Sequence, residues 1–187
     1  MAFGIALWIV LIVVVAILLW FVLIYNSFVR LRNRADNAWS QIEVQLKRRF
    51  DLIPNLIEAV KGYMKHEKST LKEVTAARTE FMKATTPMQK AKAENMLEGA
   101  LKTIFAVAES YPKLEASQNF MQLQEELTGT ESKIAYARQF YNDSVQSWNE
   151  KLQSFPSNIV AKMFSYTQRD FFKTDNAEER KAVKVNF

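Results

Sequence analysis

Two hydrophobic patterns follow each other along the chain without a break. Residues 2–29 are almost entirely Ala, Val, Ile, Leu, Trp and Phe and contain no charged side chain. From Leu31 to Met64, apolar residues instead recur at steps of three and four, with polar residues between them. The first pattern is long enough to cross a bilayer core of about 30 Å as a helix, and the second is typical of a helix with one buried face. We therefore predict a single helix that leaves a membrane and continues into a folded domain, ending near Met64.

A cleaved signal peptide is the alternative for the apolar segment. That class of segment needs a basic start, a shorter apolar core and a cleavage site of small residues. No Lys or Arg precedes the run, and Ala16 stands alone among bulky residues. The chain contains no cysteine, which also excludes a lipoprotein anchor. A retained single span is the expectation.

The rest of the chain predicts three more main helices. One begins between His66 and Thr70, with Thr70 and Glu73 as a capping box, and ends at about Thr85. A second has Thr86 as its cap and Pro87 at the first helical position, and runs toward Ser110.

The next helix opens at Pro112 and continues to about Leu152, with Gly129 in its middle. After Phe155 and Pro156 we expect a short helix of about ten residues. Apolar residues alternate in the tail, which predicts either a docked strand or a frayed end; they are Val183, Val185 and Phe187.

Only four glycines and four prolines occur in the chain, which favours long helices. Pro54 falls inside the first helix, which we expect to bend and not to end there. Short loops favour antiparallel neighbours. The predicted fold is all-α: a transmembrane helix (1–29), an antiparallel four-helix bundle (30–155), and a short helix and tail near the membrane base (156–187).

Charge indicates the orientation. Arg30, Arg32 and Arg34 follow the apolar run directly, so the positive-inside rule places the bundle in the cytoplasm and the N-terminus outside. We expect these arginines to bind lipid headgroups. The net charge is +5, and residues 30–65 account for most of it. No nucleic-acid-binding motif accompanies this charge.

The residues for common catalytic chemistry are missing from the sequence. His66 is the only histidine, there is no cysteine, and no glycine-rich phosphate loop occurs. We therefore expect no enzyme activity, no catalytic residue, no cofactor and no metal site.

Two sets of polar residues stand out as determinants of helix register or assembly. Arg49 borders the apolar stripe, and antiparallel pairing brings it level with Glu125, Glu126 or Glu131. It is interpreted either as part of an ion pair inside the bundle or as a partner-binding residue. The pattern Tyr-Asn-x-x-Val-x-x-x-Asn occurs twice and contributes four asparagines that we expect to set pairing of helices or subunits: Asn26, Asn33, Asn142 and Asn149.

An aromatic stretch near the C-terminus is the candidate surface for a partner or a second subunit. It can also close the base of its own bundle or lie on lipid headgroups. The residues are Phe155, Pro156, Phe164, Tyr166, Phe171 and Phe172.

Several motifs resemble the LemA family. They include Ala38-Trp39-Ser40-Gln41-Ile42, Asp51-Leu52-Ile53-Pro54-Asn55-Leu56, Tyr111-Pro112, Tyr141-Asn142 and Phe155-Pro156 with Asn158-Ile159-Val160-Ala161. Trp148-Asn149 stands where the family usually has Tyr-Asn, and Lys113 where it often has Asp. The resemblance implies a single-span bacterial membrane protein with an antiparallel helical bundle. It implies little about activity; one relative is linked to magnetosome membrane formation.

The sequence favours a non-catalytic scaffold in the bacterial cytoplasmic membrane that self-associates and organises membrane or cytosolic protein partners. A membrane-bound signalling adaptor is the alternative, and a hydrolase with an unrecognised site is a third. The expected partners are the lipid bilayer, further copies of the chain and an unidentified protein, with no nucleic acid.

Overall fold

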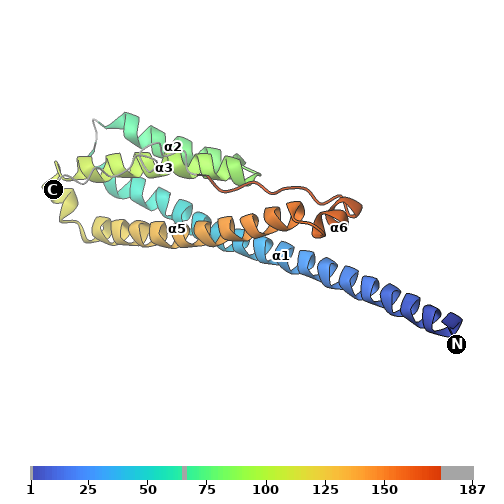
Figure 1. The fold of residues 1–187 in the computed structure, drawn as a ribbon. Coiled ribbons are helices and arrows are strands. Elements are labelled where there is room, and N and C mark those ends of the chain that lie inside the picture. Colours follow the sequence, from blue (N-terminus) through green and yellow to red (C-terminus); the bar gives the residue numbers. More distant parts are fainter. Residues whose placement is uncertain (1, 65–66, 174–187) are drawn as a thin grey trace, which may run out of the picture.

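The first helix is a single unbroken element that runs from the apolar end of the molecule into the bundle (Figure 1). The computed structural model describes residues 2–64 and 67–173, and α1 occupies Ala2–Lys61, 60 residues. At about 1.5 Å per residue it is about 90 Å long. Its apolar part extends alone beyond the other helices, and its later part lies inside the bundle (Figure 1). The predicted continuation of the apolar segment into the bundle is confirmed, and Pro54 lies inside the helix.

The remaining helices complete an all-α fold. They are α2 (Lys68–Lys83), α3 (Pro87–Ala108), α4 (Pro112–Glu115), α5 (Gln118–Gln153) and α6 (Ser157–Met163). The chain runs out along α1, back along α2, out along α3 and back along α5 (Figure 1). α5 pairs with α1, and α2 pairs with α3. The described residues contain no strand, which confirms the predicted fold class.

The core is built from the apolar stripe of α1. Ala38, Ile42, Leu46 and Phe50 follow one another at steps of four and are at most 1% exposed. Further apolar residues of α1 continue this row to the distal end of the bundle. The 3.6-residue helical period places them on one face, against which the other helices pack.

The ends of the helices differ in places from the expectation. Thr86 caps α3 in a full capping box with Gln89, as predicted. The prediction of a capping box at Thr70 is wrong, because α2 begins at Lys68 and Thr70 lies buried inside its first turns.

The helix expected from Pro112 to Leu152 is also divided. Ser117 has an extended backbone that separates α4 from α5. The short turn α4 buries Leu114 and redirects the chain between α3 and α5.

Candidate functional site

A cluster of aromatic and aliphatic side chains, here called the base cluster, joins α1, α5 and α6 at the end of the bundle next to the apolar segment. Phe28 is fully buried there, with its ring 5.5 Å from that of Trp148 and 5.2 Å from that of Tyr166. Val160 and Ala161 of α6 pack in the same cluster. This packing fixes α6 beside the last uncharged turns of α1.

After α6 and a turn at Phe164 and Ser165, the chain runs back along the bundle as a segment without helix or strand, residues 166–173, here called the strap. Its backbone is held by side chains of α5. Trp148 Nε1 donates to the carbonyl of Thr167 at 2.9 Å, and the hydroxyl of Tyr141 donates to the carbonyl of Asp170 at 3.0 Å. The strap has no neighbouring strand, so these side chains satisfy backbone groups that otherwise lack partners.

Two asparagines bind the strap most fully. The amide of Asn149 binds both backbone groups of Arg169, and the amide of Asn142 binds both backbone groups of Phe172, with all four hydrogen bonds between 2.9 and 3.1 Å. A side-chain amide has N–H donors and a carbonyl acceptor next to each other, so it can bind the N–H and C=O of one residue as a neighbouring β-strand would. Asn142 and Asn149 are seven residues apart on α5, and their partners Arg169 and Phe172 are three residues apart on the strap. Both separations correspond to about 10 Å, because a helix rises about 1.5 Å per residue and an extended chain about 3.3 Å.

The other two predicted asparagines lie elsewhere. Asn26 and Asn33 are exposed on α1. The hydrogen bonds of Asn142 and Asn149 within the described residues go to the strap, and none joins them to Asn26 or Asn33. Facing amides therefore do not pair α1 with α5 in the structure. A role of these asparagines in assembly stays a prediction.

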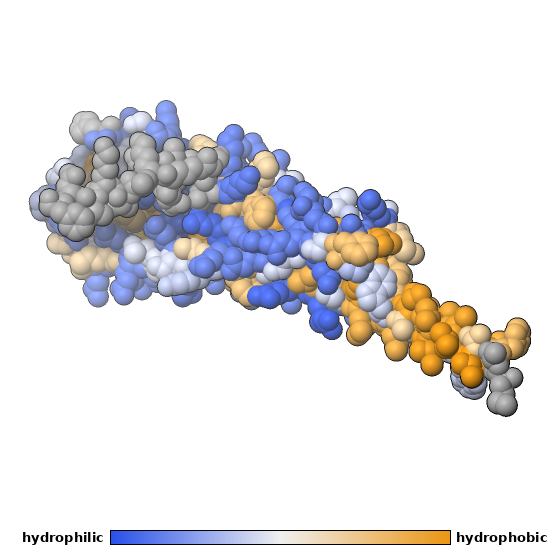
Figure 2. Space-filling model, in the orientation of Figure 1, coloured by the Kyte–Doolittle hydropathy of each residue, from blue (hydrophilic) through white to orange (hydrophobic). Residues whose placement is uncertain are grey.

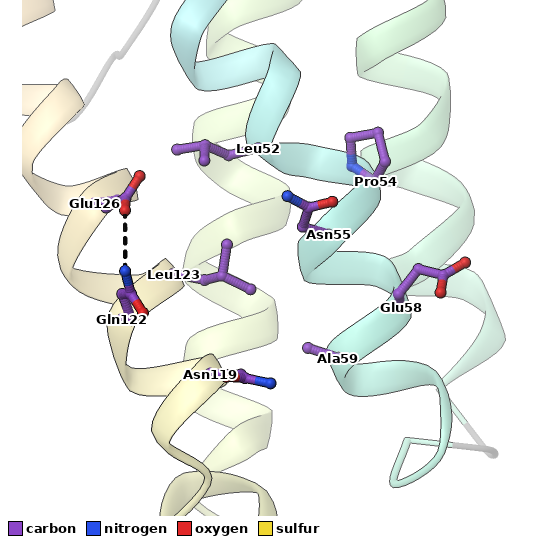
Figure 3. A pocket seen from close by; sticks show the side chains of 9 residues that line it. All are labelled: Leu52, Pro54, Asn55, Glu58, Ala59, Asn119, Gln122, Leu123 and Glu126. Carbon is purple, nitrogen blue, oxygen red and sulfur yellow. Dashed lines mark hydrogen bonds between the residues drawn. The ribbon is translucent and has the colours of Figure 1, made fainter.

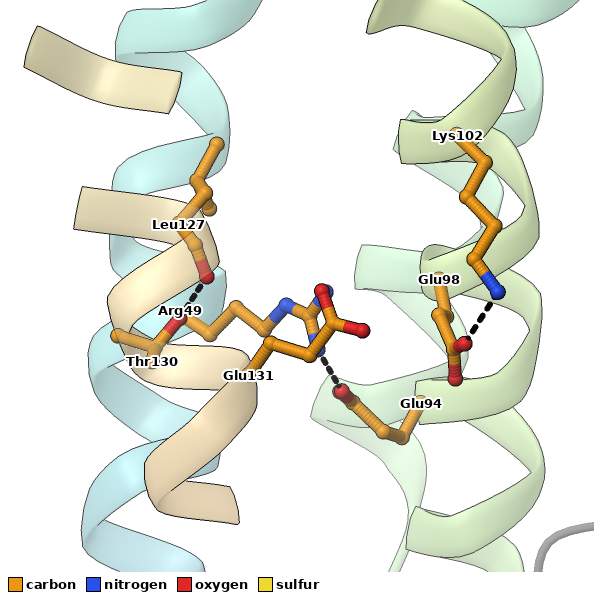
Figure 4. A network of polar contacts seen from close by, with 7 residues as sticks. All are labelled: Arg49, Glu94, Glu98, Lys102, Leu127, Thr130 and Glu131. Carbon is orange, nitrogen blue, oxygen red and sulfur yellow. Dashed lines mark hydrogen bonds and ion pairs between the residues drawn. The ribbon is translucent and has the colours of Figure 1, made fainter. Parts of the chain in front are cut away.

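The middle of the bundle contains a buried ion pair. Arg49 of α1 is 2% exposed and pairs through Nη1 with Glu94 of α3, while its Nη2 lies 3.8 Å from Glu131 Oε2 of α5 (Figure 4). Arg49 therefore links the α1–α5 pair to α3. Of the three acids that sequence reasoning proposed, the structure brings only Glu131 to Arg49.

Sequence reasoning missed Glu94, the main partner of Arg49. Glu94 lies between Ala91 and Leu97, three residues from each, on the buried stripe of α3. A charged residue in an apolar stripe was the signal that could have identified it. Burial raises the pKa of the Glu94 carboxyl above its ordinary value, and repulsion by Glu98 and Glu131 adds to this, while Arg49 opposes the shift in part.

The face of the α1–α5 pair that α2 and α3 do not cover carries an open groove. Its distal part, about 880 Å³, is lined by amide and carboxylate residues with Leu52 and Leu123 beneath them (Figure 3). Its proximal part lies between Val44 and Gln45 of α1 and Tyr136 and Phe140 of α5. Residues of both parts recur at helical spacing on the same sides of α1 and α5. We call both parts together the outer groove.

The remaining predicted residues are spread over the base of the bundle. Arg30, Arg32 and Arg34 are exposed. Arg32 lies 3.9 Å from Asp36, and Arg34 lies over the ring of Phe140. The aromatic stretch divides: Phe155 is 81% exposed, Pro156 is half-buried, Phe164 and Tyr166 contact the base cluster, Phe171 packs against the core, and Phe172 is buried against Trp39.

The contacts at these sites are apolar packing, hydrogen bonds and ion pairs. Among residues 2–64 and 67–173, no group of three or more His, Asp or Glu side chains is arranged to hold a metal ion. His66 lies outside the described residues, as do Val183, Val185 and Phe187 of the tail. Apolar packing holds the base cluster together, and side chains of α5 hydrogen-bond the backbone of the strap.

These features define a class of protein: a helical bundle whose first helix also contains a segment long and apolar enough to cross a membrane. That segment has a mean hydropathy of 3.4 and almost no burial, and in Figure 2 it forms the apolar end of the molecule. The chain belongs to the LemA family, whose profile matches residues 38–187. Family membership and the apolar helix together fit a membrane-associated helical protein.

Curated relatives share this similarity over most of the chain. Protein LemA of Metamycoplasma hominis is 28% identical over 157 residues, covering 82% of this chain and 70% of that protein. Magnetosome protein MamQ 2 of Paramagnetospirillum magneticum is 24% identical over 186 residues, covering 86% and 68%. Magnetosome protein MamQ of Magnetospirillum gryphiswaldense is 22% identical over 174 residues, covering 79% and 64%.

Proposed function

We propose that the protein is a non-catalytic scaffold, anchored by one span in the bacterial cytoplasmic membrane, that self-associates and organises membrane or partner proteins. The observation that carries this proposal is the unbroken α1. The same helix supplies the apolar segment and the central stripe of the bundle core. A rigid connection of this kind holds the bundle at a fixed position relative to the bilayer.

The outer groove supports self-association. Tyr136 is 74% exposed and Val44 is 62% exposed, although both are large apolar residues on the faces of paired helices. Oε1 of Gln45 is buried beside them without a hydrogen-bond partner. The proximal part of the groove, with exposed apolar side chains and an unused acceptor, fits the surface of another helix.

The scaffold proposal is tested with the full chain extracted in mild detergent and weighed by native mass spectrometry. We expect an assembly of more than two chains. Tyr136→Glu places a charge in the outer groove and should reduce the assembly to smaller species. Met82→Glu is the matched control, because Met82 is 69% exposed on α2, away from the groove. A monomer at all concentrations contradicts the proposal, and a fixed dimer favours the adaptor alternative.

The proposed orientation has its own test. The chain lacks cysteine, so Ser132→Cys provides a single label at an exposed position of α5. With the bundle in the cytoplasm, a membrane-impermeant maleimide should label this cysteine only after the cells are permeabilised. Labelling in intact cells would show that the bundle lies outside the cytoplasm and would contradict the proposed orientation.

A further inference from the structure

The face of α6 that points away from the bundle is apolar and exposed. Val160 and Ala161 are buried against the base cluster. The opposite side exposes Phe155 (81% exposed), Ile159 (49%) and Met163 (66%), and Phe164 (42%) lies at its edge, against α1; these four residues are here called the foot surface. Ile159 and Met163 are one helical turn apart, and Phe155 lies in the turn just before α6. Exposed apolar residues gathered at one place indicate a binding surface.

Ring contacts with α1 fix the level of the foot surface along the apolar segment. The ring of Phe164 lies 5.0 Å from that of Tyr25 and 6.2 Å from that of Phe21. Phe21 and Tyr25 precede Arg30, the first charged residue of the chain. The foot surface therefore lies beside the uncharged part of α1 and not beside the polar part.

The length of α1 places this level at the edge of the bilayer core. Residues 3–19 are exposed on all sides, and at about 1.5 Å per residue they span about 26 Å. On the bundle's side, the edge of a hydrocarbon core of about 30 Å therefore falls between Leu19, where exposure on all sides ends, and Arg30, the first charged residue. A surface that packs against Phe21 and Tyr25 lies at the boundary of acyl chains and headgroups.

We propose that the foot surface is a lipid-binding site that enters the boundary between acyl chains and headgroups on the bundle's side of the membrane. Its occupant is the phospholipid bilayer itself, continuous with the lipid around the apolar part of α1. Lys162 and Arg30 are exposed near the same level and face the headgroup phosphates. The foot gives the bundle a second attachment beside α1 and restricts its rotation and tilt. The proposal rests on α1 crossing the bilayer, which the proposed function also requires.

The test uses single cysteines in the full chain, reconstituted in phosphatidylcholine–phosphatidylglycerol vesicles. Ile159→Cys and Met163→Cys are labelled with an environment-sensitive fluorophore, with Met82→Cys, exposed on α2 away from the outer groove, as the control and Val13→Cys as the transmembrane control. Lipids that carry a nitroxide near the start of the acyl chain should quench the labels at 159 and 163 several-fold more than the label at 82. Aqueous iodide should quench in the opposite order.

The controls separate failure of this proposal from failure of the anchor. If lipid nitroxides quench the label at 13 while iodide quenches the labels at 159 and 163 as strongly as the label at 82, the foot surface is in water and the lipid proposal is wrong. If neither quencher reaches 159 and 163, protein covers the surface and the proposal is again wrong. If lipid nitroxides fail to quench the label at 13, α1 does not cross the bilayer, and both the membrane-anchored scaffold and the lipid-binding foot surface are wrong.

Discussion

The side chain of Asn149 holds the backbone of Arg169 at both of its polar groups. Nδ2 donates to the carbonyl of Arg169 at 3.0 Å, and Oδ1 accepts from its N–H at 2.9 Å. The guanidinium of Arg169 in turn lies over the ring of Trp148 and pairs with Asp36 of α1 at 2.6 Å. The strap therefore joins α5 to α1 through a residue 20 positions beyond Asn149.

Asn149→Asp should release the strap while leaving the helices in place. The carboxylate cannot donate to the carbonyl of Arg169 and repels it, so one hydrogen bond is lost and an acceptor is left unpaired. We expect a loss of about 1–2 kcal/mol in the local stability of the strap. Hydrogen exchange of the backbone amides of residues 167–172 measures this loss. Asn33→Asp on the exposed face of α1 is the control. Unchanged protection of the Arg169 amide would contradict the interpretation.

The buried ion pair predicts a large cost when one partner is removed alone. Arg49→Met leaves Glu94 buried without its main countercharge. We expect the free energy of unfolding to fall by about 3–5 kcal/mol. Adding Glu94→Leu removes the unpaired carboxylate and should restore most of the stability. Urea denaturation of the detergent-solubilised chain measures both changes. Arg48→Met, at the exposed neighbouring position, should have little effect. Equal stability of the Arg49→Met protein and the original chain would refute this account.

The pKa of Glu94 predicts a pH dependence of stability. Burial raises this pKa in the folded chain above its ordinary value of 4.5, so the folded chain binds more protons than the unfolded chain above that pH. The contribution of Glu94 to stability is therefore full below pH 4.5 and is lost as the pH rises through the pKa of the folded state.

The measurement is a difference between variants. Glu94→Gln cannot titrate, so the free energy of unfolding of the original chain should rise relative to Glu94→Gln as the pH falls from neutrality toward 4.5. Glu125→Gln, exposed on α5, serves as the control and should show no such trend. A difference between the original chain and Glu94→Gln that is constant over this range would rule out the raised pKa.

The sequence predicted features that depend on local pattern. The stripe of α1 from Ala38 to Phe50 follows from helical period alone, and the cap at Thr86 follows from three neighbouring residues. Thr70 had the same local signature but is buried in the first turns of α2, so tertiary packing decided its role. Ser117 has no breaker beside it, and its extended backbone serves the turn between α3 and α5.

The strap and the partner of Arg49 depend on contacts between distant residues. Asn142 and Asn149 were recognised as unusual, but their partners are backbone groups, which every residue carries and no sequence pattern marks. Glu94 is 45 residues from Arg49, and its pairing depends on how α3 packs against α1 and α5. Sequence therefore located polar residues that matter and could not assign the surfaces they bind.

Gly129→Ala should stabilise α5. Gly129 lies in the interior of this helix and is exposed, and a Cβ added there meets no atom within 4 Å. Glycine in a helix interior costs about 0.5–1 kcal/mol relative to alanine because the unfolded chain loses more backbone freedom on folding. Urea denaturation should show an increase of about that size. Gly99→Ala, at an equally open position in α3, should give a similar increase. Destabilisation by Gly129→Ala alone would show that a close partner, such as another copy of the chain, occupies the space next to Gly129.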